Sequence, residues 1–290
     1  MNIFKLLRQS PLSARIGMAM VLINVLAAIF APLICPYSET EVVSDVWLSP
    51  NTDNYLGTDH LGRDMFTRLV YGARNTIAIA FVTTMLSFIV GSIMGFFAAT
   101  LGGWTDLGIS RMVDILMAFP TLIFALMVLS VVGTGTMSLI VVIALLDSTR
   151  VFRLSRAVAM DIAVMEYVEA ARLRGEHIWW LMRHEILPNA LPPLVAEFGL
   201  RFCFVFLFIA SLSFLGLGIQ PPTADWGGMV RENAGAITFG IMTPLFPAAA
   251  IAFLTVGVNL IVDWFLQIAR LVSADSQRVE RLMTTNYSEA

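Results

Sequence analysis

The chain has 290 residues, of which 58% are hydrophobic and only 13% are charged. Soluble domains carry roughly a quarter charged residues, so this composition and a mean hydropathy of +0.79 indicate a membrane protein. The net charge of −3 argues against a role in nucleic-acid binding. The two cysteines, Cys35 and Cys203, give neither the spacing of a metal site nor a disulfide framework.

The apolar residues are gathered into long runs. A helix needs roughly 20 apolar residues to cross the hydrocarbon core of a bilayer. Six runs meet or approach this length, and they predict an all-α integral membrane protein with six transmembrane helices. The fourth run is short and ends in Arg150, Arg153 and Arg156. The six runs cover residues 17–35, 73–100, 109–132, 137–152, 198–219 and 244–268.

Cations precede the first run, which gives it the basic start of a signal peptide. They are Lys5, Arg8 and Arg15. No small-residue cleavage site follows the run, and the sequence Pro-Leu-Ile-Cys is a poor lipoprotein box. We therefore expect a retained anchor, with residues 1–16 as the N-terminal segment and residues 17–35 as the first transmembrane helix.

The cations also indicate the orientation of the chain. With a cytoplasmic N-terminus, the six runs place residues 36–72, 133–136 and 220–243 on the outer side. The positive-inside rule favours this arrangement, because most of the Lys and Arg residues then lie on or next to cytoplasmic segments. We expect both termini in the cytoplasm, including a polar tail over residues 269–290. The cations left at or near the outer side are Arg63, Arg68, Arg74 and Arg231.

The outer connection over residues 36–72 is rich in turn-forming residues until its last part. There Asp64, Arg68 and Arg74 stand among apolar side chains, which predicts a short amphipathic helix at the membrane surface. A solvated loop with local salt bridges is the alternative.

Two features inside the next runs concern packing. Gly91 and Gly95 form a small-xxx-small pair, which lets helix backbones approach closely. Arg111 and Asp114 lie one helical turn apart at the start of the third run and predict a local ion pair.

The segment over residues 157–197 is too polar to span a membrane but keeps a helical periodicity. Its apolar positions between Val158 and Val168 follow steps of three and four, which predicts a helix with one apolar face. Gly175 then interrupts the pattern, and a second helical piece over residues 178–186 is expected to stop at Pro188. Two short helices joined at a glycine indicate a docking element on the cytoplasmic side.

The residues that common enzymes need are missing. A phosphate-binding P-loop requires a lysine in a glycine-rich frame, and the only lysine is Lys5, without such a frame. His184-Glu185 begins like a zinc-protease helix, but Pro188 stands where the second histidine would be. His60, His177 and His184 are too scattered for a metal centre. We expect no catalytic site and no metal site.

Two acids lie inside apolar runs, and ionisable residues there are functional candidates by default. Asp147 has Arg150 three residues later, and Asp263 has Asn259 one turn earlier. We expect structural or gating roles for these residues. Two alternatives remain open: a secondary transporter that uses both acids to carry protons, and a membrane-embedded hydrolase.

Four strings, in order along the chain, resemble a known family. The first is Gly57-Thr58-Asp59 with Gly62-Arg63-Asp64, and the second is Glu169-Ala170-Ala171, Gly175 and Ile186-Leu187-Pro188-Asn189. The third runs from Ser211 to Gly218, and the fourth is Gln220-Pro221-Pro222-Thr223 with Trp226-Gly227. Together they resemble the second permease of the dipeptide, oligopeptide and nickel group of bacterial ABC importers. The chain departs from the family pattern at Val151, Glu185, Ala224, Val262, Trp264 and Leu266.

The resemblance implies a type I ABC importer permease fold, with a core over residues 73–268 and a coupling loop over residues 157–197. In that family the loop forms a coupling helix that sits in a cleft of a cytoplasmic ATPase. By resemblance, the ATPase-coupling residues are Glu169, Ala170, Ala171 and Gly175, with Leu187 and Pro188 shaping the return to the membrane. The alternative is that the alanines pack against this chain's own helices.

The family also implies partners and a location. These are a homologous second permease, two ATPase subunits (or one ATPase as a homodimer) that bind ATP and Mg, and a periplasmic solute-binding protein, with membrane lipid around them at the bacterial inner membrane. This chain itself is expected to bind no cofactor. The solute stays open among dipeptides, oligopeptides, nickel chelates, opines and glutathione-like compounds.

Overall fold

The computed structural model describes residues 10–288, and it describes the side chains of residues 10–267. Within this range the regular structure is helical, apart from two isolated bridges in the outer connection. The elements are α2 (Leu12–Ile29), α3 (Ala31–Ile34), α4 (Met65–Leu101), α5 (Gly103–Met117), α6 (Thr121–Val132), α7 (Thr136–Ala163), α8 (Glu166–Leu173), α9 (Ile178–Leu181), η1 (Met182–Ile186), α10 (Leu187–Phe214), α11 (Trp226–Asn233), η2 (Ala234–Phe239) and α12 (Leu245–Ser288).

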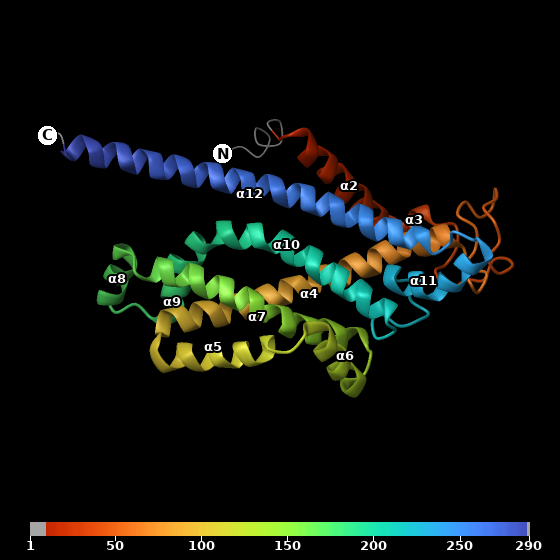
Figure 1. The fold of residues 1–290 in the computed structure, drawn as a ribbon, viewed down its shortest axis with the longest axis horizontal. Coiled ribbons are helices and arrows are strands. Elements are labelled where there is room, and N and C mark those ends of the chain that lie inside the picture. Colours follow the sequence, from red (N-terminus) through yellow and green to blue (C-terminus); the bar gives the residue numbers. More distant parts are fainter. Residues whose placement is uncertain (1–9, 289–290) are drawn as a thin grey trace.

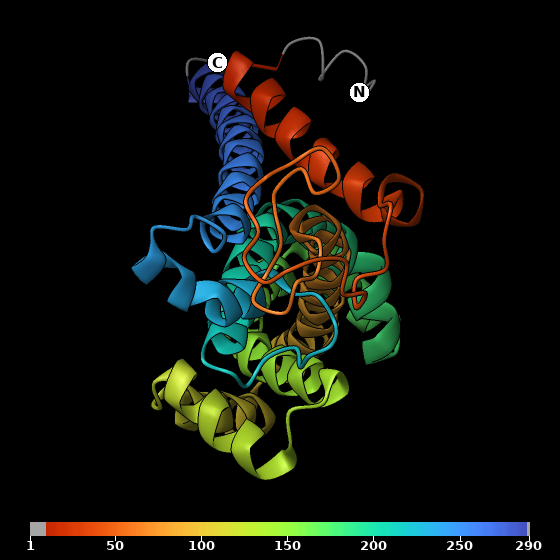
Figure 2. The same cartoon turned by 90° about the vertical axis from the view of Figure 1, so that its right-hand side faces the viewer.

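The long helices lie roughly along one axis of the molecule (Figure 1). The helices α8 and α9 lie at one end, whereas α11 and the outer connection lie at the other. The helices α2 and α12 pack side by side along one edge, and α5 and α6 lie on the opposite edge (Figures 1 and 2). The segment predicted to dock a partner and the segment predicted to face outward are thus at opposite ends.

The structure confirms the all-helical membrane architecture but gives fewer clear spans than six. In the part of the chain that the structure describes, four stretches are long and apolar enough to cross a membrane, namely α2, α4, residues 178–214 and residues 245–267. The bent pair α5–α6 would make a fifth. The helix α7 has 28 residues, or about 42 Å at the usual rise, but Asp147, Arg150 and Arg153 lower its apolar character. The fourth run is therefore a span by length and not by composition.

The third run is not one straight helix. The chain turns by 89° between α5 and α6. Pro120 precedes α6 and has no N–H to continue the helical ladder, and a proline also disfavours the α conformation at the residue before it. This explains why an unbroken apolar run is divided into two helices.

The predicted surface helix near Arg68 is wrong. Those residues form the first turns of α4, which begins at Met65. The carboxylate of Asp64 caps the helix by accepting a hydrogen bond from the Thr67 N–H at 2.8 Å. Arg68 does not face solvent: its side chain is 1% exposed, and its Nη1 lies 2.6 Å from Asp59 Oδ2. The apparent amphipathic pattern arises because the outer connection covers this part of α4.

Two predicted boundaries in the polar segment also differ. The chain breaks at Val164 and Met165, between α7 and α8, so the expected helix from Val158 onward consists of two pieces. Pro188 does not stop a helix: it is the second residue of α10, and the stretch over residues 178–214 is continuous. The intervening turn of π-helix, η1, precedes the proline. At the far end, the predicted polar tail continues α12 as a helix as far as Ser288.

The helices α4 and α7 form the most extensive helix–helix contact among the described residues. A Cβ atom on Gly91 would lie 2.6 Å from the carbonyl oxygen of Ser148, and one on Gly95 would lie 2.8 Å from the backbone nitrogen of Arg156. The Ser87 hydroxyl donates to the Ala144 carbonyl across the same contact at 3.1 Å. The close approach expected from the two glycines is confirmed, and any larger residue would separate the helices.

A charged and aromatic cluster holds the outer connection against α11. Asp59 Oδ2 accepts from Arg63 Nε at 2.8 Å, and Arg63 Nη2 lies 3.3 Å from Glu232 Oε2 on α11. Trp226 is 1% exposed and donates through Nε1 to the Leu69 carbonyl at 2.8 Å. These contacts tie the outer connection, α4 and α11 into one cap at this end (Figure 2).

Asp225 is a buried acid in this cap, and it stands at the start of α11. Its carboxylate accepts from the Gly228 N–H at 2.8 Å and from the Thr76 hydroxyl at 2.9 Å. Burial nevertheless raises the pKa of Asp225, because removing the carboxylate from water penalises its charged form more than these hydrogen bonds favour it.

We expect Gly91→Ala to destabilise the protein by about 1–3 kcal/mol, because a methyl group there meets backbone atoms of α7. Thermal unfolding in detergent would measure the loss. Gly108→Ala is the matched control, since a Cβ at that helical glycine meets nothing within 4 Å. Equal melting temperatures for the two variants would contradict the close-contact argument.

We expect Asp225→Asn to change how stability depends on pH. A raised folded-state pKa stabilises the fold below the ordinary aspartate pKa, and that contribution is lost as pH rises through the raised value. The melting temperature of the wild type should therefore fall relative to that of Asp225→Asn as the pH rises above about 4. Asp53→Asn, at an exposed position, should show no such drift. A pH-independent difference for Asp225→Asn would count against the burial argument.

Candidate functional site

The short helix α8 is the centre of the candidate site. It projects at the end of the molecule beyond α7, and the chain enters it through an extended Met165 with φ −73° and ψ 143° (Figure 1). Glu166 and Glu169 lie in its first turn and Arg172 in its last. This order of charge complements the helix dipole, which helps so short a helix to form.

One face of α8 is locked to the chain's own helices. Val168 and Ala171 are fully buried in an apolar cluster with residues from the end of α4, from α7 and from the start of the α9–α10 stretch. Arg172 adds a tether by donating through Nη2 to the Thr100 carbonyl, near the end of α4, at 3.3 Å. The position of α8 is therefore set by α4, α7 and α9 together.

The other face of α8 is free. Tyr167 is 42% exposed and Leu173 is 83% exposed, and Glu166, Glu169 and Ala170 are exposed beside them. An exposed surface that combines apolar and acidic side chains on a rigid helix is suited to contact a partner.

The structure divides the alanine pair. Ala170 faces outward with Glu169, whereas Ala171 packs inward at 0% exposure. The expectation that both alanines face a partner does not hold for Ala171, which belongs to the chain's own core. Helical geometry explains the division, because adjacent residues point about 100° apart.

Gly175 forms the turn after α8, as the sequence predicts. Its φ of +84° lies in the left-handed region, and its N–H donates to the Arg172 carbonyl at 2.9 Å. A Cβ at this position would meet nothing within 4 Å. Glycine is required here by the backbone conformation and not by crowding.

Leu187 and Pro188 lie apart from the free face of α8. Both are exposed at the start of α10, and Leu187 lines a groove between α10 and α4. They belong to the return into the bundle, which the sequence predicts, and not to the exposed surface of α8.

The buried acid Asp147 has a partner that sequence reasoning missed. Its Oδ1 lies 3.7 Å from Arg201 Nη1 on α10, and Arg201 Nε donates to Glu197 Oε1 at 2.7 Å. Arg150, three residues after Asp147, lies instead with its guanidinium 4.2 Å from the centre of the Phe204 ring. The sequence indicates this partner only through Glu197 and Arg201, which stand four residues apart at the edge of an apolar run.

The remaining predicted polar residues do not form one site. Asp114 pairs with Arg153 of α7 at 2.7 Å, and Arg111 is exposed, so the expected local pair is replaced by one between helices. On α12, Asn259 is half-buried and Asp263 is exposed. Within the described side chains, no hydrogen bond or ion pair joins Asp263 to Asp147.

One group of side chains has the geometry of a metal site. Asp59, His60 and Glu232 each offer a ligand atom within 4.8 Å of the others, at the outer cap. The same carboxylates already contact Arg63 and Arg68, however. The two guanidinium groups supply the positive charge that a cation would bring, so this group fits a structural ion-pair cluster.

Known proteins resemble this chain over most of its length. Residues 87–270 match the family of binding-protein-dependent transport system inner membrane components. A dipeptide transport system permease of Alkalihalophilus pseudofirmus is 35% identical, over 90% of this chain and 86% of that protein. A di/tripeptide transport system permease of Pseudomonas aeruginosa is 34% identical, over 85% of this chain and 84% of that protein.

A glutathione transport system permease of Pectobacterium atrosepticum is 31% identical, over 84% of this chain and 81% of that protein. Among solved structures, a chain of the inward-facing methionine ABC transporter MetNI has the same fold, with a TM-score of 0.57 and 21% identity. That match covers 72% of this chain and 97% of the other. The resemblance seen in the four sequence strings is confirmed. The chain belongs to the family of binding-protein-dependent transport system inner membrane components and is a permease of the ABC importer type.

Proposed function

We propose that this permease forms half of a translocation path for peptides or similar small solutes and docks an ATPase subunit through the free face of α8. The observation that carries the docking role is the division of α8 into a locked face and a free face. Val168 and Ala171 fix the helix to the bundle, while Glu169 and Ala170 remain available to a partner. A helix that is rigidly mounted can transmit a push or a pull, which a flexible loop cannot.

The class of solute is proposed from the relatives. Those described above are named for dipeptide, di/tripeptide and glutathione transport, and all three names denote small peptides or peptide-like compounds. We therefore place short peptides ahead of nickel chelates and opines as the solute of this chain.

The proposed cycle is alternating access. A periplasmic binding protein delivers solute to this chain and a homologous permease, which together enclose the path. Two ATPase subunits bind ATP and Mg, close on each other, and draw the α8 helices together; hydrolysis resets them. The shift is driven by the different affinities of ATP for the two states. This chain supplies the moving walls and no catalytic residue.

The proposed orientation places the α8 end in the cytoplasm. The end of α12 lies at the same end of the molecule as α8, in keeping with a cytoplasmic C-terminus (Figure 1). Arg172, Arg174 and Arg183 belong to the same region of the chain, as the positive-inside rule favours for a cytoplasmic face. The outer cap then faces the periplasm, where the binding protein would approach.

Ala170→Trp tests the docking role. The new side chain lies on the free face of α8, so it should obstruct a partner's groove and leave the bundle folded. We expect at least about a tenfold loss of co-purifying ATPase, since a clash of even 1.4 kcal/mol gives that factor. Ala234→Trp, at an exposed position in η2 at the opposite end, is the control and should retain the ATPase. Full retention by Ala170→Trp, with an unchanged melting temperature, would refute docking through α8.

The energy source distinguishes the importer from a proton-coupled transporter. We expect uptake of a labelled dipeptide by the assembled complex in vesicles to stop without ATP or without the binding protein. A protonophore should leave uptake unchanged. A proton-coupled transporter predicts the opposite result. This chain alone would take up the dipeptide, and the protonophore, Asp147→Asn or Asp263→Asn would abolish that uptake.

A further inference from the structure

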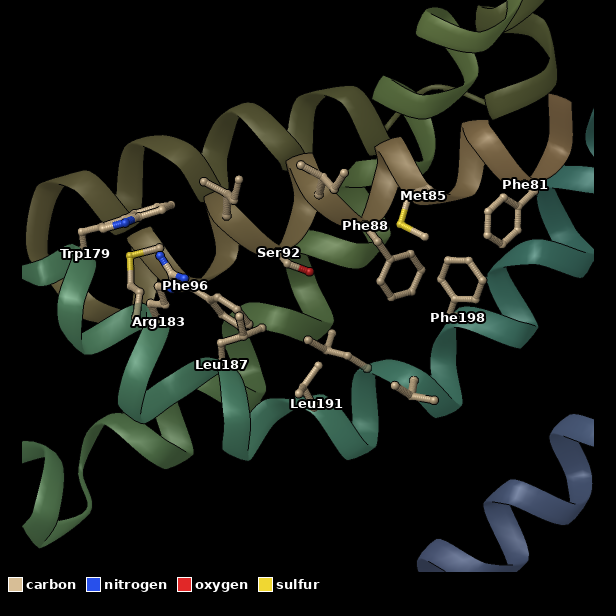
Figure 3. Close-up of a pocket in the computed structure, with 15 residues that line it drawn as sticks. Phe81, Met85, Phe88, Ser92, Phe96, Trp179, Arg183, Leu187, Leu191 and Phe198 are labelled. Carbon is tan, nitrogen blue, oxygen red and sulfur yellow. The ribbon is translucent and has the colours of Figure 1, made fainter. Parts of the chain in front are cut away.

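An open groove runs between α4 and α10 and has a volume of about 730 Å³. On α4 it follows one stripe of the helix from Phe81 to Phe96, and on α10 it extends from Leu187 to Phe198 (Figure 3). The α10 side is about 16 Å long at the usual helical rise. Half of a hydrocarbon core of about 30 Å has nearly the same depth. The groove thus matches a single leaflet of a bilayer.

The groove has a buried floor and exposed walls. Phe96, Met182 and Leu194 are 4–5% exposed and form its floor. Leu191 and Val195 are 47% and 57% exposed and stand at its edge on α10. Both helices belong to stretches that are apolar enough to span a membrane. An apolar channel open along such helices is in a position to hold acyl chains.

Two side chains with polar tips mark one end of the otherwise apolar groove. Trp179 and Arg183 lie together there, at the end next to α9 (Figure 3). Arg183 is exposed, and among the described side chains no hydrogen bond or ion pair satisfies its guanidinium. Tryptophan is enriched where a protein crosses from the hydrocarbon to the headgroup region of a bilayer. The groove therefore passes from an apolar floor to a free cation at the expected level of the headgroups.

We propose that an anionic phospholipid occupies this groove, with its acyl chains on the apolar floor and its phosphate on Arg183. The charge of Arg183 complements a phosphate, and the guanidinium can bond two phosphate oxygens at once. The polar face of α10, with Glu197 and Arg201, is turned roughly a quarter of the way around the helix from the groove. The groove thus lies apart from the polar face that suits a solute path.

The bound lipid would steady the approach to α8. Arg183 lies in η1, and η1 and α9 lead back through Gly175 to α8. A phosphate on Arg183, with acyl chains against α4, would hold α9 to the end of α4. The inference rests on the membrane position of α4 and α10, and it stands whether or not α8 docks an ATPase.

Lipid counting by native mass spectrometry tests the proposal. The protein would be purified, with the subunits that accompany it, in mild detergent supplied with either phosphatidylglycerol or phosphatidylcholine. We expect Arg183→Gln to bind about fivefold less phosphatidylglycerol, the factor that one cation contributes near an anionic lipid surface. Binding of phosphatidylcholine should change much less.

Two further variants make the test specific. Leu191→Trp fills the groove without changing charge, so it should displace phosphatidylglycerol while the melting temperature stays near that of the wild type. Arg111→Gln removes another exposed arginine that does not line the groove, and it should retain the lipid. Undiminished phosphatidylglycerol on Arg183→Gln or on Leu191→Trp would overturn the proposal. Equal losses of bound phosphatidylglycerol from Arg111→Gln and Arg183→Gln would also overturn it. The same holds if Leu191→Trp keeps its phosphatidylglycerol but no longer co-purifies with a second permease.

Discussion

The close approach of α4 and α7 is the constraint on which the rest of the structure depends. In a bilayer, lipid tails are as apolar as the helices, so helices associate through tight packing and not through a hydrophobic driving force. Gly91 and Gly95 permit that packing by removing the side chains that would hold the backbones apart. α10 packs on both members of the pair, and α2 and α5 pack on α4.

The same pair explains how a short helix outside the bundle can be positioned firmly. α7 is one helix of 28 residues that leads from the bundle interior almost to α8. The end of α4 supplies Phe96 and the Thr100 carbonyl to the contacts beneath α8. α8 therefore rests on both helices. Asp147 lies on α7, and its partner Arg201 lies on α10. These contacts form a continuous path of packed residues from α8 to the buried acid Asp147 in the bundle.

Much of this architecture could be predicted from the sequence, because it follows from local patterns. Apolar runs show where helices lie in lipid, and the turn at Gly175 needs only a residue that tolerates positive φ. Features set by tertiary contacts could not be predicted. The inward direction of Ala171 depends on how α8 rests against α9, and the burial of Arg68 depends on a connection folding back over α4. The partner of Asp147 lies 54 positions away, so no local spacing indicates it.

The outer cap has a consequence for the order in which the molecule is completed. Arg63 belongs to the connection after the first helices, yet its contact with Glu232 joins residues separated by 169 positions. Asp59 pairs with Arg63 and Arg68 within the first part of the chain, but Glu232 joins them only when α11 has been made. A chain that is interrupted earlier keeps these charges without Glu232 and lacks Trp226. Closure of the cap thus requires synthesis as far as α11, and a chain interrupted before that point cannot form it.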